Sequence, residues 1–108
     1  MTHPSEQEFD ALATRILLQS TDLRIIPKGL IARLLAPVRG PVRIPRPQLR
    51  EVKCVAYRDH PSFREKLAPM GETVEIVDIV TPAKTYTLFF DAPHGAEFAA
   101  AATAWMRR

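Results

Sequence analysis

The fourteen residues PVRGPVRIPRPQLR, positions 37–50, constrain the fold of this chain more than any other stretch. They contain four prolines and four arginines and no acidic residue. Each proline lacks an amide hydrogen and its ring crowds the preceding turn, so no helix can run through this stretch. It must therefore be built from extended segments and bends. Within it, PVRIP can form an edge strand, with Val42 and Ile44 facing inward and Arg43 facing outward.

Upstream of this stretch, residues 5–19 have the pattern of an amphipathic helix. Ser5 and Glu8 have the spacing of a capping box, in which each side chain accepts a hydrogen bond from a backbone amide of the first turn. Apolar residues then recur at helical intervals: Phe9, Leu12, Ala13, Ile16 and Leu17. We therefore predict a helix over residues 5–19, whose apolar stripe packs against the body of the domain or against a second copy of the chain.

Residues 22–91 favour a β-rich body. TDLRIIP and LIARLLA are short runs rich in isoleucine and leucine, and Gly29 between them suits a tight turn, so we predict a hairpin. LIARLLA alone also suits a turn of helix. REVKCVAYR alternates clearly and places Cys54 on its apolar face, where a small core residue is expected rather than a nucleophile. ETVEIVDIVT and KTYTLFFD, joined by a turn around Pro82, predict two further strands.

The sequence PHGAEFAAAATAWMRR favours a second helix over residues 93–107. Pro93 suits its first turn, Asp91 is a candidate N-cap, and Glu97 lies near its positive end. Apolar residues recur along it at helical spacing: Phe98, Ala101, Ala102 and Trp105. The alanines let such a helix approach a sheet closely, and the two aromatic side chains need an apolar surface to cover.

Two of these segments carry a resemblance to a known family. VRIPRPQLREVKCV, in the middle of the chain, and TYTLFFDAPHGAEFAAAATAW, near its end, are similar to bacterial pleckstrin-homology-like (PH-like) domains. In that family a strand of the form RIP leads through a short bend into the next strand. A late strand then ends in an acid and a proline, before an alanine-rich helix capped by an aromatic residue. The resemblance covers residues 22–107 and rests on patterns of residue type.

The resemblance implies an α+β fold, in which a strongly bent antiparallel sheet, or split β-barrel, is closed by the C-terminal helix. The helix over residues 5–19 is an extra N-terminal element, and the sequence predicts six strands at most, one fewer than the seven usual in the family. Eukaryotic relatives bind phosphoinositides through a lysine and a later basic-X-basic pair. Lys28 lies in the corresponding loop but no such pair follows it, so the motif predicts no headgroup recognition. Bacterial members serve mostly as interaction or assembly modules.

Positive charge is concentrated in the middle of the chain. Residues 24–58 contain nine basic residues and one acid, within a chain of formal net charge +3 at pH 7. Such segregation can make one side of a domain electropositive, or it can simply solvate several faces. The prolines and arginines of positions 37–50 also suit an edge strand that is protected from unwanted pairing. If the patch is functional, its candidate residues for binding an acidic partner are Lys28, Arg39, Arg43, Arg46, Lys53 and Arg58.

The chain lacks the patterns that catalysis and cofactor binding require. Its three histidines and single cysteine have no metal-binding or catalytic spacing, and four glycines are too few for a phosphate-cradling loop. We therefore expect a protein that is not an enzyme, with no catalytic residues, no cofactor, no metal site and no small-molecule substrate. The prolines also miss the PxxP spacing of a proline-rich ligand.

At 108 residues, with 46% apolar and 25% charged residues, the chain has the size and composition of one soluble domain, residues 1–108. We expect no signal peptide and no membrane-spanning helix, and a single cysteine favours the cytoplasm. The expected function is a non-catalytic binding or assembly module that recognises a protein or another acidic partner, including a homo-oligomer formed through the N-terminal helix or a sheet edge. The candidate partners include an anionic membrane surface as well. The alternative is a nucleic-acid-binding protein that uses residues 24–58, where only Tyr57 is present to stack on bases.

Overall fold

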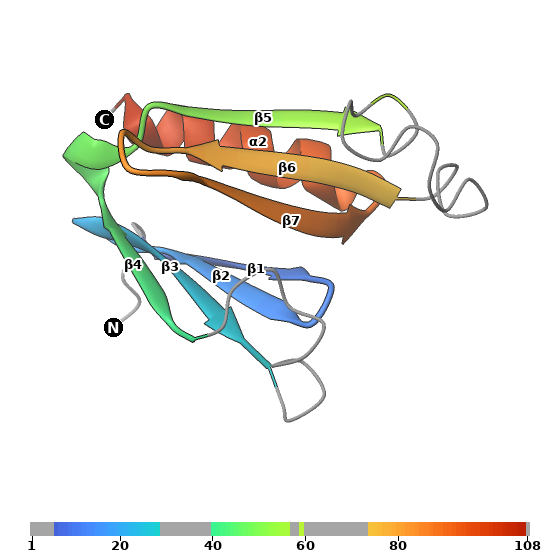
Figure 1. The fold of residues 1–108 in the computed structure, drawn as a ribbon, viewed down its shortest axis with the longest axis horizontal. Coiled ribbons are helices and arrows are strands. Elements are labelled where there is room, and N and C mark those ends of the chain that lie inside the picture. The colour runs from blue at the N-terminus through green and yellow to red at the C-terminus, as the bar shows by residue number, and fades with distance from the viewer. Residues whose placement is uncertain (1–5, 29–39, 57–58, 60–73, 108) are drawn as a thin grey trace.

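The computed structural model describes residues 6–28, 40–56, 59 and 74–107. The elements within these ranges are β1 (Gln7–Ala11), β2 (Thr14–Leu18), β3 (Asp22–Pro27), β4 (Val42–Pro45), the short 3-10 helix η1 (Arg46–Gln48), β5 (Glu51–Ala56), β6 (Val74–Val80), β7 (Thr85–Asp91) and α2 (His94–Met106). The strands pair antiparallel in two sheets, of order β1-β2-β3-β4 and β5-β6-β7, and η1 lies on the connection between them (Figure 1). The fold is α+β with a C-terminal helix, which confirms the helix expected over residues 93–107.

The prediction of an N-terminal helix over residues 5–19 is wrong, because β1 and β2 form a hairpin there. The same residues also contain a strand pattern, since Thr14, Ile16 and Leu18 are buried at every second position of β2. Leu12, a member of the predicted helical stripe, is instead 52% exposed at the turn. Contact with a second copy of the chain through this helix, which the sequence suggested, therefore cannot form, because the helix is absent from the described residues.

The turn between β1 and β2 carries none of the residues that usually mark a tight turn. Ala11 pairs with Thr14, so Leu12 and Ala13 alone form the loop, and Ala13 has a φ of 56° that glycine or asparagine favours. Contacts with the rest of the molecule stabilise the turn instead. The backbone amide of Leu12 donates to the carbonyl of Phe89 in β7 over 2.7 Å, and the amide of Lys28 donates to the carbonyl of Ala13 over 3.0 Å.

Most of the strands predicted after residue 21 are confirmed. β3, β5, β6 and β7 lie where the sequence predicts them, and the turn around Pro82 is closed by a backbone hydrogen bond between the residues that flank it. β4 is an edge strand, in which Ile44 is buried, Val42 packs against the core and Arg43 faces outward. LIARLLA, the predicted partner of β3 in a hairpin, lies outside the described residues.

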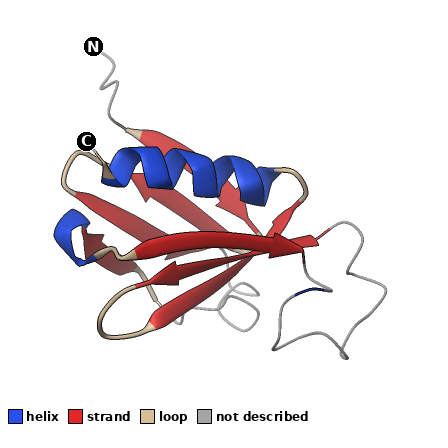
Figure 2. Cartoon of the chain, turned by 90° about the horizontal axis from the view of Figure 1, so that it is seen from above, coloured by secondary structure: helices blue, strands red, loops and turns tan. Residues whose placement is uncertain are grey.

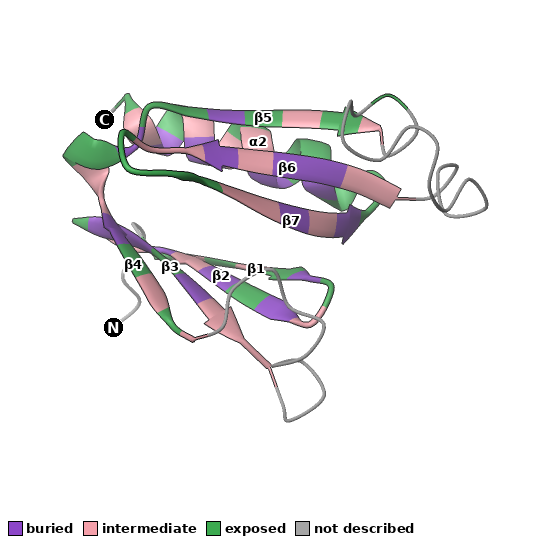
Figure 3. Cartoon of the chain, viewed as in Figure 1, coloured by how far each residue is buried: buried purple, intermediate pink, exposed green. Residues whose placement is uncertain are grey.

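One apolar core lies between the two sheets and the helix. Buried and exposed residues alternate along the strands, because every second side chain points into this core (Figure 3). α2 crosses the second sheet and contacts β5, β6 and β7 (Figure 2). Its Phe98 packs against Phe9 of β1 and Phe90 of β7, with ring centroids 5.1 and 5.3 Å apart, so the helix touches both sheets. Among the described strands no pairing joins the sheets, and they form no closed barrel.

The start of α2 depends on a close contact with β6. Asp91, a candidate N-cap in the sequence, does not take that role: the cap is Pro93, whose own side chain makes no capping hydrogen bond. Glu75 of β6 accepts a hydrogen bond from the backbone amide of Ala96 over 3.0 Å. A Cβ atom at Gly95 would lie 2.9 Å from the Cβ of Glu75, so only glycine allows the helix to pack this close to the strand.

Candidate anion-binding surface

The predicted basic residues that the structure describes do not gather in one place. Lys28, just after β3, forms a 3.0 Å ion pair with Asp10 of β1. Lys53 lies on β5, in the other sheet, and forms a 3.5 Å ion pair with Glu51. Two predicted site residues lie outside the described part of the chain: Arg39 and Arg58. Both lysines therefore have an acidic neighbour, and they belong to different sheets.

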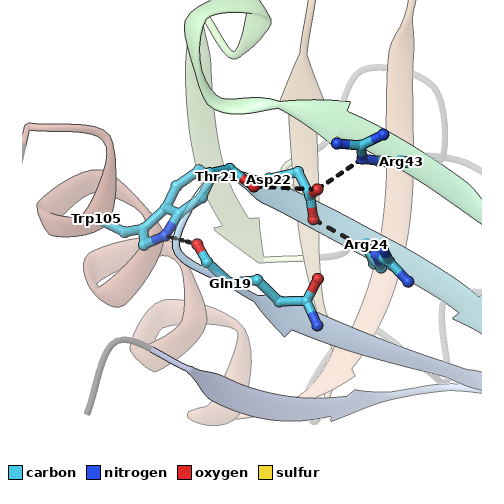
Figure 4. A network of polar contacts seen from close by, with 6 residues as sticks. All are labelled: Gln19, Thr21, Asp22, Arg24, Arg43 and Trp105. Atoms are coloured by element: carbon cyan, nitrogen blue, oxygen red, sulfur yellow. Dashed lines mark hydrogen bonds and ion pairs between the residues drawn. The ribbon is translucent and has the colours of Figure 1, made fainter. Parts of the chain in front are cut away.

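Arg46 packs against Trp105 of α2. Its guanidinium carbon lies 4.6 Å from the centroid of the Trp105 ring, a cation–π contact worth about 0.5–1 kcal/mol at exposed sites. Its Nε atom is buried and has no hydrogen-bond partner among the described residues. The same indole ring donates from Nε1 to the carbonyl of Gln19 over 2.6 Å (Figure 4). Arg46 therefore belongs to the contact between η1, α2 and the β2–β3 turn.

Arg43 belongs to a cluster that the sequence prediction missed. Arg43 of β4 lies directly opposite Arg24 of β3, and both reach Asp22 of β3 (Figure 4). The Nε atom of Arg43 donates to Oδ2 of Asp22 over 2.6 Å, and the Nε atom of Arg24 lies 3.5 Å from Oδ1. We call these three residues the Asp22 cluster. Only the register between β3 and β4 brings the two arginines together, and sequence spacing does not reveal that register.

The carboxylate of Asp22 lies beneath the two arginine side chains. Alternation places Asp22, Arg24 and Ile26 on the outer face of β3, opposite the buried Leu23 and Ile25. The side chain of Asp22 is nevertheless only 3% exposed, whereas those of Arg24 and Arg43 are 48% and 63% exposed. A buried carboxylate is tolerated where cations and hydrogen bonds compensate it, and such charge-assisted bonds contribute about 1.5–3 kcal/mol. Asp22 thus holds two exposed guanidinium groups by their Nε edges.

Two hollows flank the Asp22 cluster on the outer face of the first sheet. One, of about 410 Å³, is lined by Ile26, Pro41 and Val42 beside both arginines, and its apolar side chains on this face are those of Ile26 and Pro41, because Val42 packs against the core. The other, of about 370 Å³, is more polar and lies toward the β2–β3 turn. Its lining residues are Glu6, Gln19, Ser20, Thr21, Asp22, Arg24 and Arg43. The two arginines line both hollows and stand between them.

The remaining charges on this outer face compensate one another. Arg15 of β2 lies 3.3 Å from Glu8 and 3.8 Å from Asp10, both on β1. The hydrogen bond from Lys28 lowers the pKa of Asp10, which therefore stays ionised at neutral pH. Since these two acids are matched by two cations, the described charges that remain beside the two hollows are the Asp22 cluster, whose three residues carry one net positive charge, and the carboxylate of Glu6.

Other titratable side chains offer no comparable arrangement. A hollow of about 350 Å³ between the β1–β2 turn and the start of α2 is bordered by Asp10, Asp91 and His94, and no group of three or more metal-ligating side chains lies together in the described part. Burial, followed by the charge of Glu75, raises the pKa of the Cys54 thiol to about 11. The thiol is therefore protonated at neutral pH, which makes it a poor nucleophile.

No model of a protein family matches this sequence, and no curated protein matches it either. Within the described residues, no helix has the length and apolar character needed to cross a membrane.

Proposed function

We propose that this chain is a non-catalytic binding or assembly module of the PH-like type, and that it recognises an acidic partner through the outer face of β3 and β4. The observation that carries this proposal is the Asp22 cluster. It presents two guanidinium groups side by side on neighbouring strands, with the Arg24 side chain about half exposed and that of Arg43 more so.

The PH-like assignment is supported by the order of the elements. The described residues contain seven strands, four in one sheet and three in the other, followed by a helix that packs against the second sheet. Seven is the number usual in that family. The described residues reach it because the β1–β2 hairpin replaces the helix expected from the sequence. With two sheets bent around a common core, the finer description as a split barrel closed by α2 belongs to this proposal.

The Asp22 cluster suits recognition because its arginines are positioned before a partner arrives. An arginine side chain loses rotamer entropy when it is fixed in a complex, and that loss lowers affinity. Arg43 is already anchored by a 2.6 Å hydrogen bond from Nε, which leaves the two terminal nitrogens of its planar fork directed away from Asp22. A carboxylate or phosphate can accept hydrogen bonds from that edge. We propose the cytoplasm as the location, in keeping with a single free cysteine.

An amide-resolved NMR titration at low and moderate salt tests the proposal. Three acidic probes are added in turn: vesicles of phosphatidylcholine and phosphatidylserine, a short DNA duplex, and the blocked peptide Ser-Glu-Ser-Leu-Ser. We expect saturable shifts centred on Arg24, Ile26, Val42 and Arg43 with one probe. A duplex that binds there would favour the nucleic-acid alternative.

Two variants locate the binding surface. Arg24→Gln removes one guanidinium at the weaker, 3.5 Å contact of the cluster and leaves the 2.6 Å bond between Arg43 and Asp22, so we expect it to reduce binding at least fivefold in a chain that is still folded, which thermal unfolding verifies. Arg50→Gln removes an exposed arginine just before β5, outside the cluster, and should bind like the parent. Equal losses in both variants, or shifts scattered over the whole molecule and abolished by salt, would refute recognition at β3 and β4.

A further inference from the structure

Resting on that proposed function, we propose the chemical class of the partner: an extended protein segment in which an acidic side chain and an apolar side chain lie two residues apart. The acid binds the two arginines of the Asp22 cluster. The apolar side chain enters the neighbouring hollow, beside Ile26 and Pro41.

The charge of the cluster matches one carboxylate better than a polyanion. Asp22 neutralises one of the two arginines, so the three residues together carry one net positive charge. Lys28, the next cation along this face, is already hydrogen-bonded to Asp10. Proteins that bind duplex DNA neutralise many phosphates, commonly six to ten, and the described residues of this face offer far fewer cations. Among the described residues that line the two hollows, none is aromatic and able to stack on a base.

The apolar hollow distinguishes a protein segment from a simple anion. Its described walls are mainly apolar, and it adjoins both guanidinium groups. A headgroup or a free phosphate has no side chain to place there, whereas a peptide does. Burial of a leucine-sized side chain is favourable by about 1.5–3 kcal/mol when complete. A segment that carries both groups therefore gains from both parts of the surface.

The spacing follows from strand geometry. Arg24 and Ile26 are two residues apart on the same face of β3. Arg43 of β4 and Pro41, which directly precedes β4, are likewise two residues apart. A strand rises about 3.3 Å per residue, so the row of arginines and the apolar row are about 6.6 Å apart. Side chains i and i+2 of an extended peptide have that same spacing and direction. The surface therefore fits acid-X-apolar rather than two adjacent residues.

Four blocked peptides test this inference by NMR titration of the intact chain. Ser-Glu-Ser-Leu-Ser has both groups at the proposed spacing. Ser-Gln-Ser-Leu-Ser lacks the carboxylate, Ser-Glu-Ser-Ser-Ser lacks the apolar side chain, and Ser-Glu-Leu-Ser-Ser has the same composition at the wrong spacing. We expect each of the last three to bind about tenfold more weakly than the first, a difference of about 1.4 kcal/mol.

A variant of the hollow completes a double-mutant cycle. Ile26→Thr keeps a β-branched residue on β3 but removes part of the apolar wall. It should weaken Ser-Glu-Ser-Leu-Ser several-fold and leave Ser-Glu-Ser-Ser-Ser unchanged, because only the first peptide places a side chain against residue 26. Thermal unfolding of the variant verifies that it is folded at the temperature of the titration.

The outcomes separate this inference from the proposed function. If Ser-Glu-Ser-Ser-Ser and Ser-Glu-Leu-Ser-Ser bind as tightly as Ser-Glu-Ser-Leu-Ser, the proposed contact of an apolar side chain with the hollow is refuted and acid recognition stands. Shifts with vesicles or duplex but with no peptide also refute the inference and leave acid recognition intact. If the Gln peptide binds as tightly as the Glu peptide, or no probe shifts the β3–β4 amides, both are overturned.

Discussion

Asp22 is a carboxylate in a position where strands of a two-layer fold usually carry a solvated side chain. It belongs by alternation to the outer face of β3, yet its side chain is 3% exposed because Arg24 and Arg43 cover it. Its Oδ1 atom has no hydrogen-bond partner among the described residues, so the contact with Arg24 is electrostatic. The residue therefore depends on both cations for its compensation.

The first prediction concerns this carboxylate. Asp22→Asn keeps the shape of the side chain but turns a charge-assisted hydrogen bond into a neutral one, so we expect the free energy of unfolding to fall by about 1–3 kcal/mol. Urea unfolding measures this change. Asp91→Asn, at an exposed position at the end of β7, is the matched control and should change stability by less than about 0.5 kcal/mol. Equal stability of both variants would show that Asp22 is not held by the arginines.

The sequence predicts less of the Asp22 cluster than of the strands that carry it. PVRIP identifies β4 as an edge strand with Arg43 outward, because prolines and alternation are local signals. Arg24 was not among the predicted site residues, since its proximity to Arg43 depends on the register of β3 against β4. Arg46 was predicted as a binding residue, but it contacts Trp105, a residue far away along the chain. Local sequence patterns specify whether a side chain points toward the core or toward solvent, whereas the pairing of strands is a property of the folded molecule.

At the scale of elements, the β1–β2 hairpin shows how tertiary contacts override local preference. Residues 5–19 have helical spacing of apolar side chains and no glycine or asparagine at the turn, so a helix is the better local solution. The hairpin is favoured because Ile16 and Leu18 reach the common core and the turn hydrogen-bonds to β7. A sequence pattern alone cannot supply those partners.

The hairpin gives the second prediction. Ala13 has a φ of 56°, a conformation that costs an alanine about 1–2 kcal/mol and a glycine almost nothing. Ala13→Gly should therefore stabilise the protein by about 0.5–1 kcal/mol, after the greater entropy of glycine in the unfolded chain is subtracted. Thermal unfolding tests the change. Ala104→Gly, on an exposed position of α2, is the control and should destabilise by about 1 kcal/mol. A loss of stability in Ala13→Gly would contradict the strained turn.

At the scale of the whole molecule, the side chain of Trp105 connects α2 to the first sheet and to η1. Trp105 is fully buried, donates to the Gln19 carbonyl in the β2–β3 turn and lies under Arg46 of η1. Together with the contact of Phe98 with Phe9, it joins α2 to the first sheet, although most of the helix packs on the second. We therefore expect both sheets and the helix to unfold in one cooperative transition.

The third prediction follows from the Trp105 contact. Trp105→Phe removes the indole donor and part of the buried ring, so the Gln19 carbonyl loses its partner and stability should fall by about 2–3 kcal/mol. Amide exchange in β2 and β3 should accelerate as much as in β6, because the sheets share one core. Tyr86→Phe is the control: that residue is only partly buried, and stability should change by less than about 0.5 kcal/mol. Faster exchange confined to α2 would show that the sheets are independent.

The hydrogen bond between residues 105 and 19 spans 86 positions, and it sets an order of events during biosynthesis. The ribosome releases the strands of both sheets before α2, the helix that completes the core. Until Phe98 and Trp105 emerge, the inner face of the first sheet, with Leu18, Leu23 and Ile25, has no helix to cover it. The nascent chain therefore exposes an aggregation-prone apolar surface, and a stall before residue 98 would leave a substrate for chaperones.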